Sequence, residues 1–166
     1  MVLPEILQAD AEILERFVIE SHNITYTLIS SLSDSLGLDT QSSIEHQHPY
    51  NGPSYTSLLL ANMPTAGKVS DYPDNQHTDY GLITLNFIEE WGMQIELPWN
   101  KQWATIVPKS GHTLVNVSNT LQSLTGNKLH SCQHRVTQFV DGVEKRSYVG
   151  YLLRPVLGWG VQKLPS

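Results

Sequence analysis

The chain has little cysteine and little basic charge, and both shortages exclude classes of function. Cys132 is its only cysteine, which rules out an internal disulfide and a zinc site built from several thiolates. Only 10 Lys and Arg stand against 16 Asp and Glu, which gives a net charge of −6. Binding to nucleic acid or to an anionic membrane needs clustered basic side chains, so we expect neither partner.

Long apolar segments are missing as well. No run approaches the about 18 apolar residues that would cross a bilayer, so we expect no membrane-spanning helix. Residues 1–5 contain no basic stretch followed by an apolar run, so we expect no secretory signal and a cytoplasmic location. The 166 residues, of which 40% are hydrophobic, are enough for one domain, residues 1–166, with a sizeable core.

A single long amphipathic helix is predicted at about residues 10–37. Asp10 can cap its start and Gly37 can end it. We expect His22 and the Ser-rich face to lie in solvent, with the helix acting as scaffold. Apolar side chains recur at steps of three and four residues, which is the spacing of one helical face: Ile13, Leu14, Phe17, Val18, Ile24, Leu28, Ile29, Leu32 and Leu36.

The remainder of the chain reads as a polar loop followed by short strands. Residues 38–54 are rich in turn formers, and the pair His46 and His48 has no third metal ligand nearby, so we predict that both lie on the surface. From about residue 55 to 155, short strands with turn signals between most of them predict a β-sandwich or barrel without a second long helix. The expected strands are 55–63, 82–88, 93–97, 103–107, 113–118, 129–137 and 147–153.

The strongest chemical signal is His77-Thr78-Asp79, taken together with His134. Residues i and i+2 of a strand point the same way, so His77 and Asp79 can reach one metal, while His134 must come from another strand. Two imidazoles and a carboxylate on one face form the ligand set of non-haem iron(II), with the opposite positions open. Among 7 His and 16 acidic residues, one H-x-D also arises by chance, so the motif alone does not decide.

Several runs in order along residues 58–155 resemble the catalytic core of the iron(II)/2-oxoglutarate-dependent oxygenases. The branch that includes isopenicillin N synthase is the most similar. The resemblance implies a mainly β fold, a double-stranded β-helix or jelly roll (about 55–155) with the long N-terminal helix packed on one sheet. It also implies that His77, Asp79 and His134 hold Fe(II). The matching runs are 77–85 (HTDxGxLTL), 92–95 (GLQV), 103–108, 114–122 (VVNIGDxLQ), 130–136 (KSxxHRV), and Arg146 ahead of 151–155.

The resemblance further implies an oxidoreductase that uses 2-oxoglutarate. Such enzymes decarboxylate this co-substrate to succinate while they hydroxylate, desaturate or close a ring in a small organic molecule, often in secondary metabolism. The far carboxylate of the co-substrate would pair with Arg146, whose guanidinium can form two parallel hydrogen bonds. Where the family has R-x-S, this chain has Arg146-Ser147-Tyr148. Tyr148 therefore occupies the hydroxyl position, and Ser147 would face the other side of the strand unless a bulge intervenes.

Two further hypotheses stay open beside the dioxygenase. The family's co-substrate tyrosine before a proline is replaced by Met63, so two co-substrate contacts are altered. A redox-neutral cyclase or isomerase, or an oxidation without 2-oxoglutarate, would fit these changes, and so would a non-catalytic remnant. Relatives also carry an N-terminal region before the helix. Without it we expect exposed apolar surface, covered by a partner or in a homo-oligomer.

Overall fold

The computed structural model describes residues 3–48, 50–64, 75–90, 92–137 and 145–156, and every structural statement concerns these residues. Two antiparallel sheets form the body of the molecule, one of four strands in the order β1-β7-β2-β5 and one of three in the order β4-β3-β6. The strands are β1 (Ser57–Pro64), β2 (Ile83–Phe87), β3 (Met93–Glu96), β4 (Trp103–Thr105), β5 (Leu114–Val117), β6 (His134–Val136) and β7 (Lys145–Leu153).

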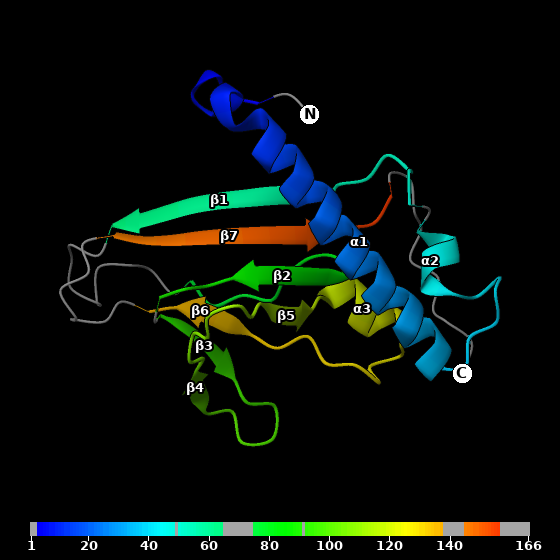
Figure 1. The fold of residues 1–166 in the computed structure, drawn as a ribbon. Coiled ribbons are helices and arrows are strands. Elements are labelled where there is room, and N and C mark those ends of the chain that lie inside the picture. The colour runs from blue at the N-terminus through cyan, green and yellow to red at the C-terminus, as the bar shows by residue number, and fades with distance from the viewer. Residues whose placement is uncertain (1–2, 49, 65–74, 91, 138–144, 157–166) are drawn as a thin grey trace.

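The long helix lies across one face of the larger sheet, where it contacts β7 and β2 (Figure 1). The predicted mainly β architecture with one long N-terminal helix is confirmed. The helices are η1 (Glu5–Asp10), α1 (Ala11–Ser35), α2 (Ile44–Gln47) and α3 (Asn119–Leu124), of which η1 is a 3-10 helix. Among the described residues, no helix is long and apolar enough to cross a membrane.

The C-terminal end of α1 was predicted correctly from the sequence, whereas the cap at its N-terminal end was not. Gly37 adopts φ +68°, and the amide of Leu38 donates to the carbonyl of Ser33 over 3.0 Å, so the helix ends at a glycine as expected. The capping role predicted for Asp10 is wrong. Its side chain makes no capping hydrogen bond, because the preceding 3-10 turn runs directly into α1.

The buried face of α1 is polar and small rather than apolar. Ser21, Thr25 and Ser33 are buried together with Ile29, so the expectation of a solvated Ser-rich face is wrong. Thr25 donates to the carbonyl of Ser21 within the helix over 3.0 Å, while Ser33 lies 3.0 Å from the carbonyl of Ile29 and donates to the carboxylate of Glu45 over 2.6 Å. Small side chains let the helix approach the sheet closely, while Ile13 of the predicted stripe remains 70% exposed.

His22 is not a solvated side chain either. Its Nε2 lies 3.1 Å from the carbonyl oxygen of Tyr50, which can only accept, so Nε2 carries the proton. Its Nδ1 therefore accepts from the hydroxyl of Tyr151, 2.7 Å away. Tyr151 lies in β7, so this half-buried imidazole joins α1 both to the sheet and to the loop after α2.

The predicted loop contains the one-turn helix α2. His46 is exposed as expected, but the surface position predicted for His48 is wrong. His48 is 1% exposed, and its Nε2 lies 2.7 Å from the carbonyl oxygen of Arg154. Ile44, at the start of α2, is completely buried in the core.

The core lies between α1 and the larger sheet. Ile83 and Leu85 of β2 point toward it together with Tyr151 and Leu153 of β7, as alternation along the strands requires. All seven predicted strands are present, although most are shorter than expected and the segment 129–137 is a strand only at His134–Val136. The short helix α3, which follows β5, was not predicted.

Candidate metal centre

Backbone pairing brings the three predicted metal ligands together. The amide of His77 donates to the carbonyl of His134 over 3.0 Å, and the amide of His134 donates back to the carbonyl of His77 over 2.8 Å. This bridge joins the segment before β2 to the start of β6. Asp79 is held on the same segment, because its carbonyl accepts from the amide of Asn119 over 2.9 Å.

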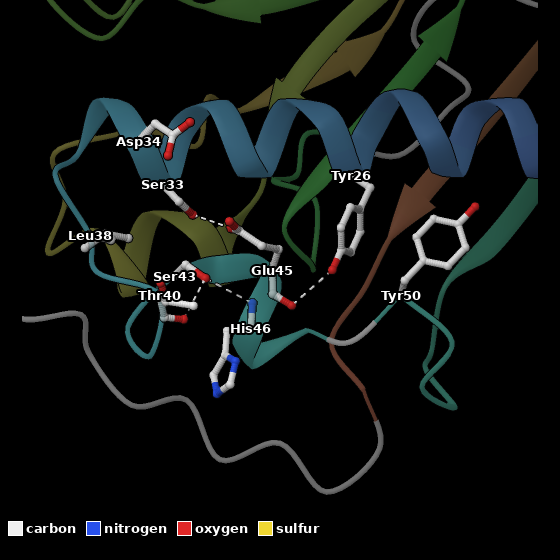
Figure 2. A pocket seen from close by; sticks show the side chains of 9 residues that line it. All are labelled: Tyr26, Ser33, Asp34, Leu38, Thr40, Ser43, Glu45, His46 and Tyr50. Carbon is white, nitrogen blue, oxygen red and sulfur yellow. Dashed lines mark hydrogen bonds between the residues drawn. The ribbon is translucent and has the colours of Figure 1, made fainter.

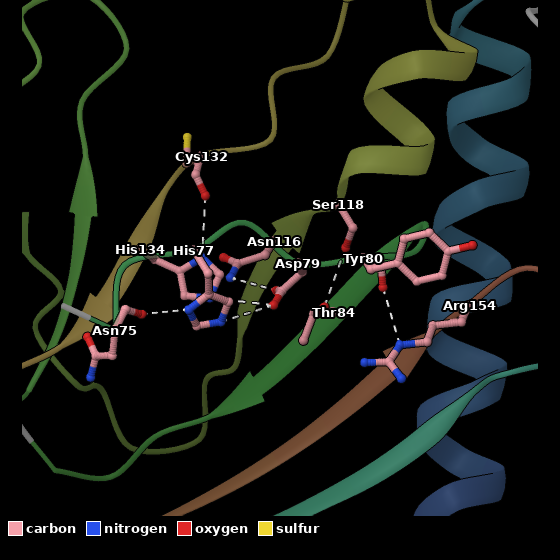
Figure 3. A network of polar contacts seen from close by, with 10 residues as sticks. All are labelled: Asn75, His77, Asp79, Tyr80, Thr84, Asn116, Ser118, Cys132, His134 and Arg154. Atoms are coloured by element: carbon pink, nitrogen blue, oxygen red, sulfur yellow. Dashed lines mark hydrogen bonds and ion pairs between the residues drawn. The ribbon is translucent and has the colours of Figure 1, made fainter. Parts of the chain in front are cut away.

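The ligand atoms of His77, Asp79 and His134 converge on one point (Figure 3). They lie within 4.8 Å of one another. Oδ1 of Asp79 is 3.8 Å from Nε2 of His77 and 3.5 Å from Nε2 of His134. Two atoms that ligate one metal at right angles, with bonds of about 2.1 Å, lie ~3 Å apart. The observed separations are slightly longer than that, so a small inward movement would be needed to bind an ion.

The imidazole tautomers also fit a metal. Nδ1 of His77 lies 2.7 Å from the carbonyl oxygen of Asn75, and Nδ1 of His134 lies 3.3 Å from that of Cys132. A carbonyl oxygen only accepts, so each Nδ1 carries the proton of the neutral ring, and each Nε2 presents a lone pair toward Asp79. A hydrogen bond from the remote ring nitrogen is the usual way in which a protein orients a metal-binding histidine.

Asp79 is 8% exposed and held from its other side. The amide of Asn116 lies 3.4 Å from Oδ2, which leaves Oδ1 directed at the two imidazoles. Burial alone would raise the pKa of Asp79, but the hydrogen bond and charge of His134 outweigh it, with further help from Thr84 and Asn116. The pKa of this carboxyl therefore lies below its ordinary value, and the group is an anion at neutral pH.

His134 shows the complementary shift. Burial alone would lower its pKa, but the neighbouring Asp79 carboxylate raises it above the ordinary value. The Asp79 carboxylate thus favours the protonated form of His134. The side chain of His77, in contrast, is 58% exposed, so the centre is buried on the Asp79 and His134 side and open on the His77 side.

The residues predicted to hold the co-substrate lie on β7. Arg146 is 1% exposed, and Tyr148 lies on the same face of the strand. The pairing of β1 with β7 runs in continuous register without a bulge, and Ser147 is exposed on the opposite face. Burial raises the pKa of Tyr148 to about 12, so its hydroxyl is a donor at neutral pH. Met63 pairs with Arg146 in the register, while its side chain lies outside the described part of the chain.

Sequence reasoning missed Asn116, whose side-chain amide contacts the carboxylate of Asp79. The signal was available, because Asn116 lies in a predicted strand and pairs with Thr84 of β2, the strand that follows the H-x-D segment. Side chains that are paired in an antiparallel sheet share a face. The polar residues of both strands were therefore candidates for one inner surface.

A cavity of about 450 Å³ lies elsewhere, between α1 and the segment that carries α2 (Figure 2). Glu45 occupies its wall, and its carboxylate accepts from Ser33 over 2.6 Å and from Ser30 over 3.3 Å. None of the three converging ligands lines this cavity. Its polar groups hold α2 against α1.

Comparison with known proteins decides the family. The model of the 2OG-Fe(II) oxygenase superfamily matches residues 55–155, which contain the whole centre. The chain belongs to this superfamily. The 2-oxoglutarate-dependent dioxygenase iboH of Amanita muscaria is 36% identical over 92% of this chain and 76% of its own length. The dioxygenase FG08081 of Gibberella zeae is 29% identical over 92% of this chain and 46% of its own length.

A solved structure shares the fold of this oxygenase-family chain. JOX2, crystallised with 2OG, Fe and JA, superposes with a TM-score of 0.83 at 19% identity over 97% of this chain and 47% of its own. This likeness confirms the predicted jelly roll. The chain spans about half the length of FG08081 and of JOX2.

Proposed function

We propose that this chain is the catalytic core of an Fe(II)/2-oxoglutarate-dependent dioxygenase that oxidises a small organic molecule. The observation that carries the proposal is the convergence of the Nε2 atoms of His77 and His134 on one oxygen of Asp79. Membership in the superfamily and the 36% identity to iboH support the same reading. The proposed reaction is hydroxylation, desaturation or ring formation.

In this proposal His77, Asp79 and His134 hold the iron, which with oxygen supplies the oxidising chemistry. The chain's own work is to hold the ligand atoms in position. The carbonyls of Asn75 and Cys132 fix the two ring tautomers, and Asn116 fixes the carboxylate. The exposed side of His77 leaves a route by which a substrate reaches the centre.

We assign the far carboxylate of 2-oxoglutarate to Arg146 and Tyr148. A buried guanidinium attracts a carboxylate strongly, because little solvent screens the charges. Tyr148 lies two residues farther along the same face and offers a hydroxyl donor. Ser147 is exposed on the other face of β7, so it takes no part in this assignment.

The direct test is succinate formation. The full chain is incubated with iron(II), 2-oxoglutarate and oxygen, and succinate is quantified with and without candidate small molecules. We expect succinate from the wild type and a loss of at least about 100-fold in Asp79→Ala, the scale on which removed catalytic groups act.

The matched control is His112→Ala. His112 is exposed and lies outside the three converging ligands, so this variant removes an imidazole and leaves the centre intact. Equal loss in both variants would point to iron bound elsewhere. No succinate from the wild type under any condition would refute the proposed co-substrate.

A second candidate is favoured by the altered co-substrate contacts. Tyr148 is much bulkier than the serine or threonine of the family motif, and Met63 replaces the family's tyrosine. On the same fold and metal, a redox-neutral cyclase or isomerase, or an oxidation without 2-oxoglutarate, would tolerate both changes. Product formed from a substrate in the absence of 2-oxoglutarate would favour this candidate. A non-catalytic protein would give neither product nor succinate.

The narrower expectations from the sequence also stay proposals. Placement in the branch of isopenicillin N synthase rests on the quoted motifs, and a role in secondary metabolism on the likeness to fungal dioxygenases. A second copy or a partner over the apolar surface is supported by Ile6, Ile13 and Leu59, which are 86%, 70% and 50% exposed. A sedimentation experiment that gives a monomer at all concentrations would argue against the homo-oligomer. The cytoplasmic location stays a prediction.

A further inference from the structure

Three buried hydrogen-bond donors have no partner among the described residues: the hydroxyl of Ser131, the amide nitrogen of Asn86 and the hydroxyl of Tyr148, of which the last two lie on neighbouring strands. A buried polar group without a partner costs about 1–3 kcal/mol of stability. Leucine would fill nearly the volume of Asn86, and phenylalanine that of Tyr148, without this cost. Their presence therefore needs an explanation outside the fold itself.

The two groups lie on one face of neighbouring strands. Asn86 of β2 pairs with Gly150 of β7, and Tyr148 precedes Gly150 by two residues on the same side. Diagonal neighbours of this kind are about 7–8 Å apart at the backbone, within reach of long side chains. Gly150 contributes no side chain, and a Cβ placed there would be in ordinary van der Waals contact, 3.6 Å from Cβ of Leu59, 3.7 Å from Cδ1 of Leu152 and 3.8 Å from Oδ1 of Asn86. The missing side chain therefore leaves only a small gap beside Asn86 on this face.

The same face continues to the metal centre. Thr84 precedes Asn86 by two residues and pairs with Asn116, whose amide contacts Asp79. In the other direction, Arg146 precedes Tyr148 by two residues on the same face of β7. Asn86 and Tyr148 thus lie between the proposed iron ligands and the buried guanidinium.

Tyr148 also reaches the opposite sheet. A Cβ built on Gly92, directly before β3, would lie 3.1 Å from the tyrosine hydroxyl, and Gly92 has φ +148°. The phenol thus extends from β7 to the chain entering the three-stranded sheet, and the glycine leaves room for it.

We propose that the Asn86 amide and the Tyr148 hydroxyl together bind the far carboxylate of the 2-oxo acid, which makes Asn86 a specificity residue for dicarboxylic co-substrates. Both groups are donors, and an ionised carboxylate is a pure acceptor with room for several bonds. Arg146 lies beyond both groups on the same face, so its guanidinium gives the far carboxylate a charged partner as well. The inference rests on the proposed function, because it assumes that a 2-oxo acid occupies the site.

The test measures binding rather than turnover. The full chain is loaded with zinc(II), which undergoes no redox chemistry, and titrated in a calorimeter with 2-oxoglutarate or 2-oxopentanoate. These two acids have the same number of carbons, but only the first has a far carboxylate. We expect Asn86→Leu and Tyr148→Phe each to weaken 2-oxoglutarate binding about tenfold, the size of a hydrogen bond to a charged group. Binding of 2-oxopentanoate should change less than about twofold.

Ser147→Ala is the matched control, because it removes a hydroxyl from the exposed face of the same strand. It should bind both acids as the wild type does. If Asn86→Leu leaves 2-oxoglutarate binding unchanged, or weakens both acids equally, the inference is overturned while the proposed function stands. If the wild type binds neither acid, the proposed co-substrate and this inference both fail.

Thermal melting of the unliganded variants gives a second, independent reading. Replacing an unpartnered buried donor by an apolar group of similar shape is nearly neutral or stabilising. Asn86→Leu should therefore melt at or above the wild-type temperature while it binds 2-oxoglutarate more weakly. A melting temperature several degrees lower would mean that the amide serves the fold, which overturns the inference.

Discussion

Gly81→Ala is the perturbation whose cost follows most directly from the structure. Gly81 adopts φ +138°, a region that is essentially restricted to glycine. A Cβ added there would lie 2.6 Å from the carbonyl oxygen of Leu153, which is backbone and cannot swing aside. The same position joins the metal-binding segment to the core, since the carbonyl of Gly81 accepts from the amide of Thr120 over 2.9 Å.

The expected loss has two parts. A side chain in this backbone region costs about 1–3 kcal/mol, and forcing an extra carbon into a packed site costs about 1–3 kcal/mol. We therefore expect Gly81→Ala to lower the free energy of unfolding by about 4 kcal/mol. Metal affinity should fall too, because Asp79 lies two residues away and must move with the loop.

Gly111→Ala measures the backbone strain without the steric clash, so it separates the two parts of the expected loss. Gly111 has φ +72°, but a Cβ there would meet nothing within 4 Å, so only the backbone strain of about 1–2 kcal/mol applies. Urea titration followed by circular dichroism gives both free energies by linear extrapolation. If Gly81→Ala costs no more than Gly111→Ala, the close approach to Leu153 does not exist in solution, and the argument fails.

Three other predictions concern pH and packing. The pKa of His22 is lowered, chiefly by burial and also by the charge of His48, against the hydrogen bond to Tyr50. The stability that neutral His22 contributes is therefore full above about pH 6.5 and is lost as the pH falls below that value. In denaturant titrations at several pH values, the difference in free energy of unfolding between wild type and His22→Phe should narrow as the pH falls below about 6.5. A difference that does not change with pH would contradict this. Burial alone would lower the pKa of His134, but Asp79 raises it above its ordinary value. Because a protonated imidazole cannot bind a metal, the zinc(II) affinity measured by calorimetry should weaken as the pH falls through a range that begins above about 6.5. An affinity independent of pH would exclude His134 as a ligand. Ser33→Ala should cost about 1–3 kcal/mol in urea unfolding, because Ser33 Oγ accepts from the amide of Ile44 over 2.9 Å, and a loss below about 0.5 kcal/mol would mean that this contact is not formed.

The convergence of the three candidate ligands could be predicted because the H-x-D pair is local and the run around His134 resembles the oxygenase motif. The H-x-D spacing and the order of the motifs pointed to the same three residues that the structure brings within 4.8 Å of one another. Strand existence was predictable for a similar reason, since alternation and turn residues are written in short windows. The strand ends were not, because they depend on which neighbour each strand pairs with.

The errors arose where tertiary contacts override local pattern. Ser21 and Thr25 looked like a solvated helix face, yet both are buried, because close packing of α1 on the sheet favours small side chains. The hydroxyl of Thr25 bonds back to the helix. His22 and His48 looked like surface residues, but each finds a partner on a distant segment, Tyr151 and Arg154 respectively. No sequence window contains both members of such a pair.

The central claim, an iron(II) centre that chelates 2-oxoglutarate, is tested most directly by anaerobic spectroscopy. Iron(II) and 2-oxoglutarate are added to the full chain, and the weak visible charge-transfer band of the chelate is recorded for the wild type and for His134→Ala. We predict a band in the wild type that is lost in His134→Ala. Iron binding without the band would contradict the claim for 2-oxoglutarate, and a wild type that binds no iron would contradict it entirely.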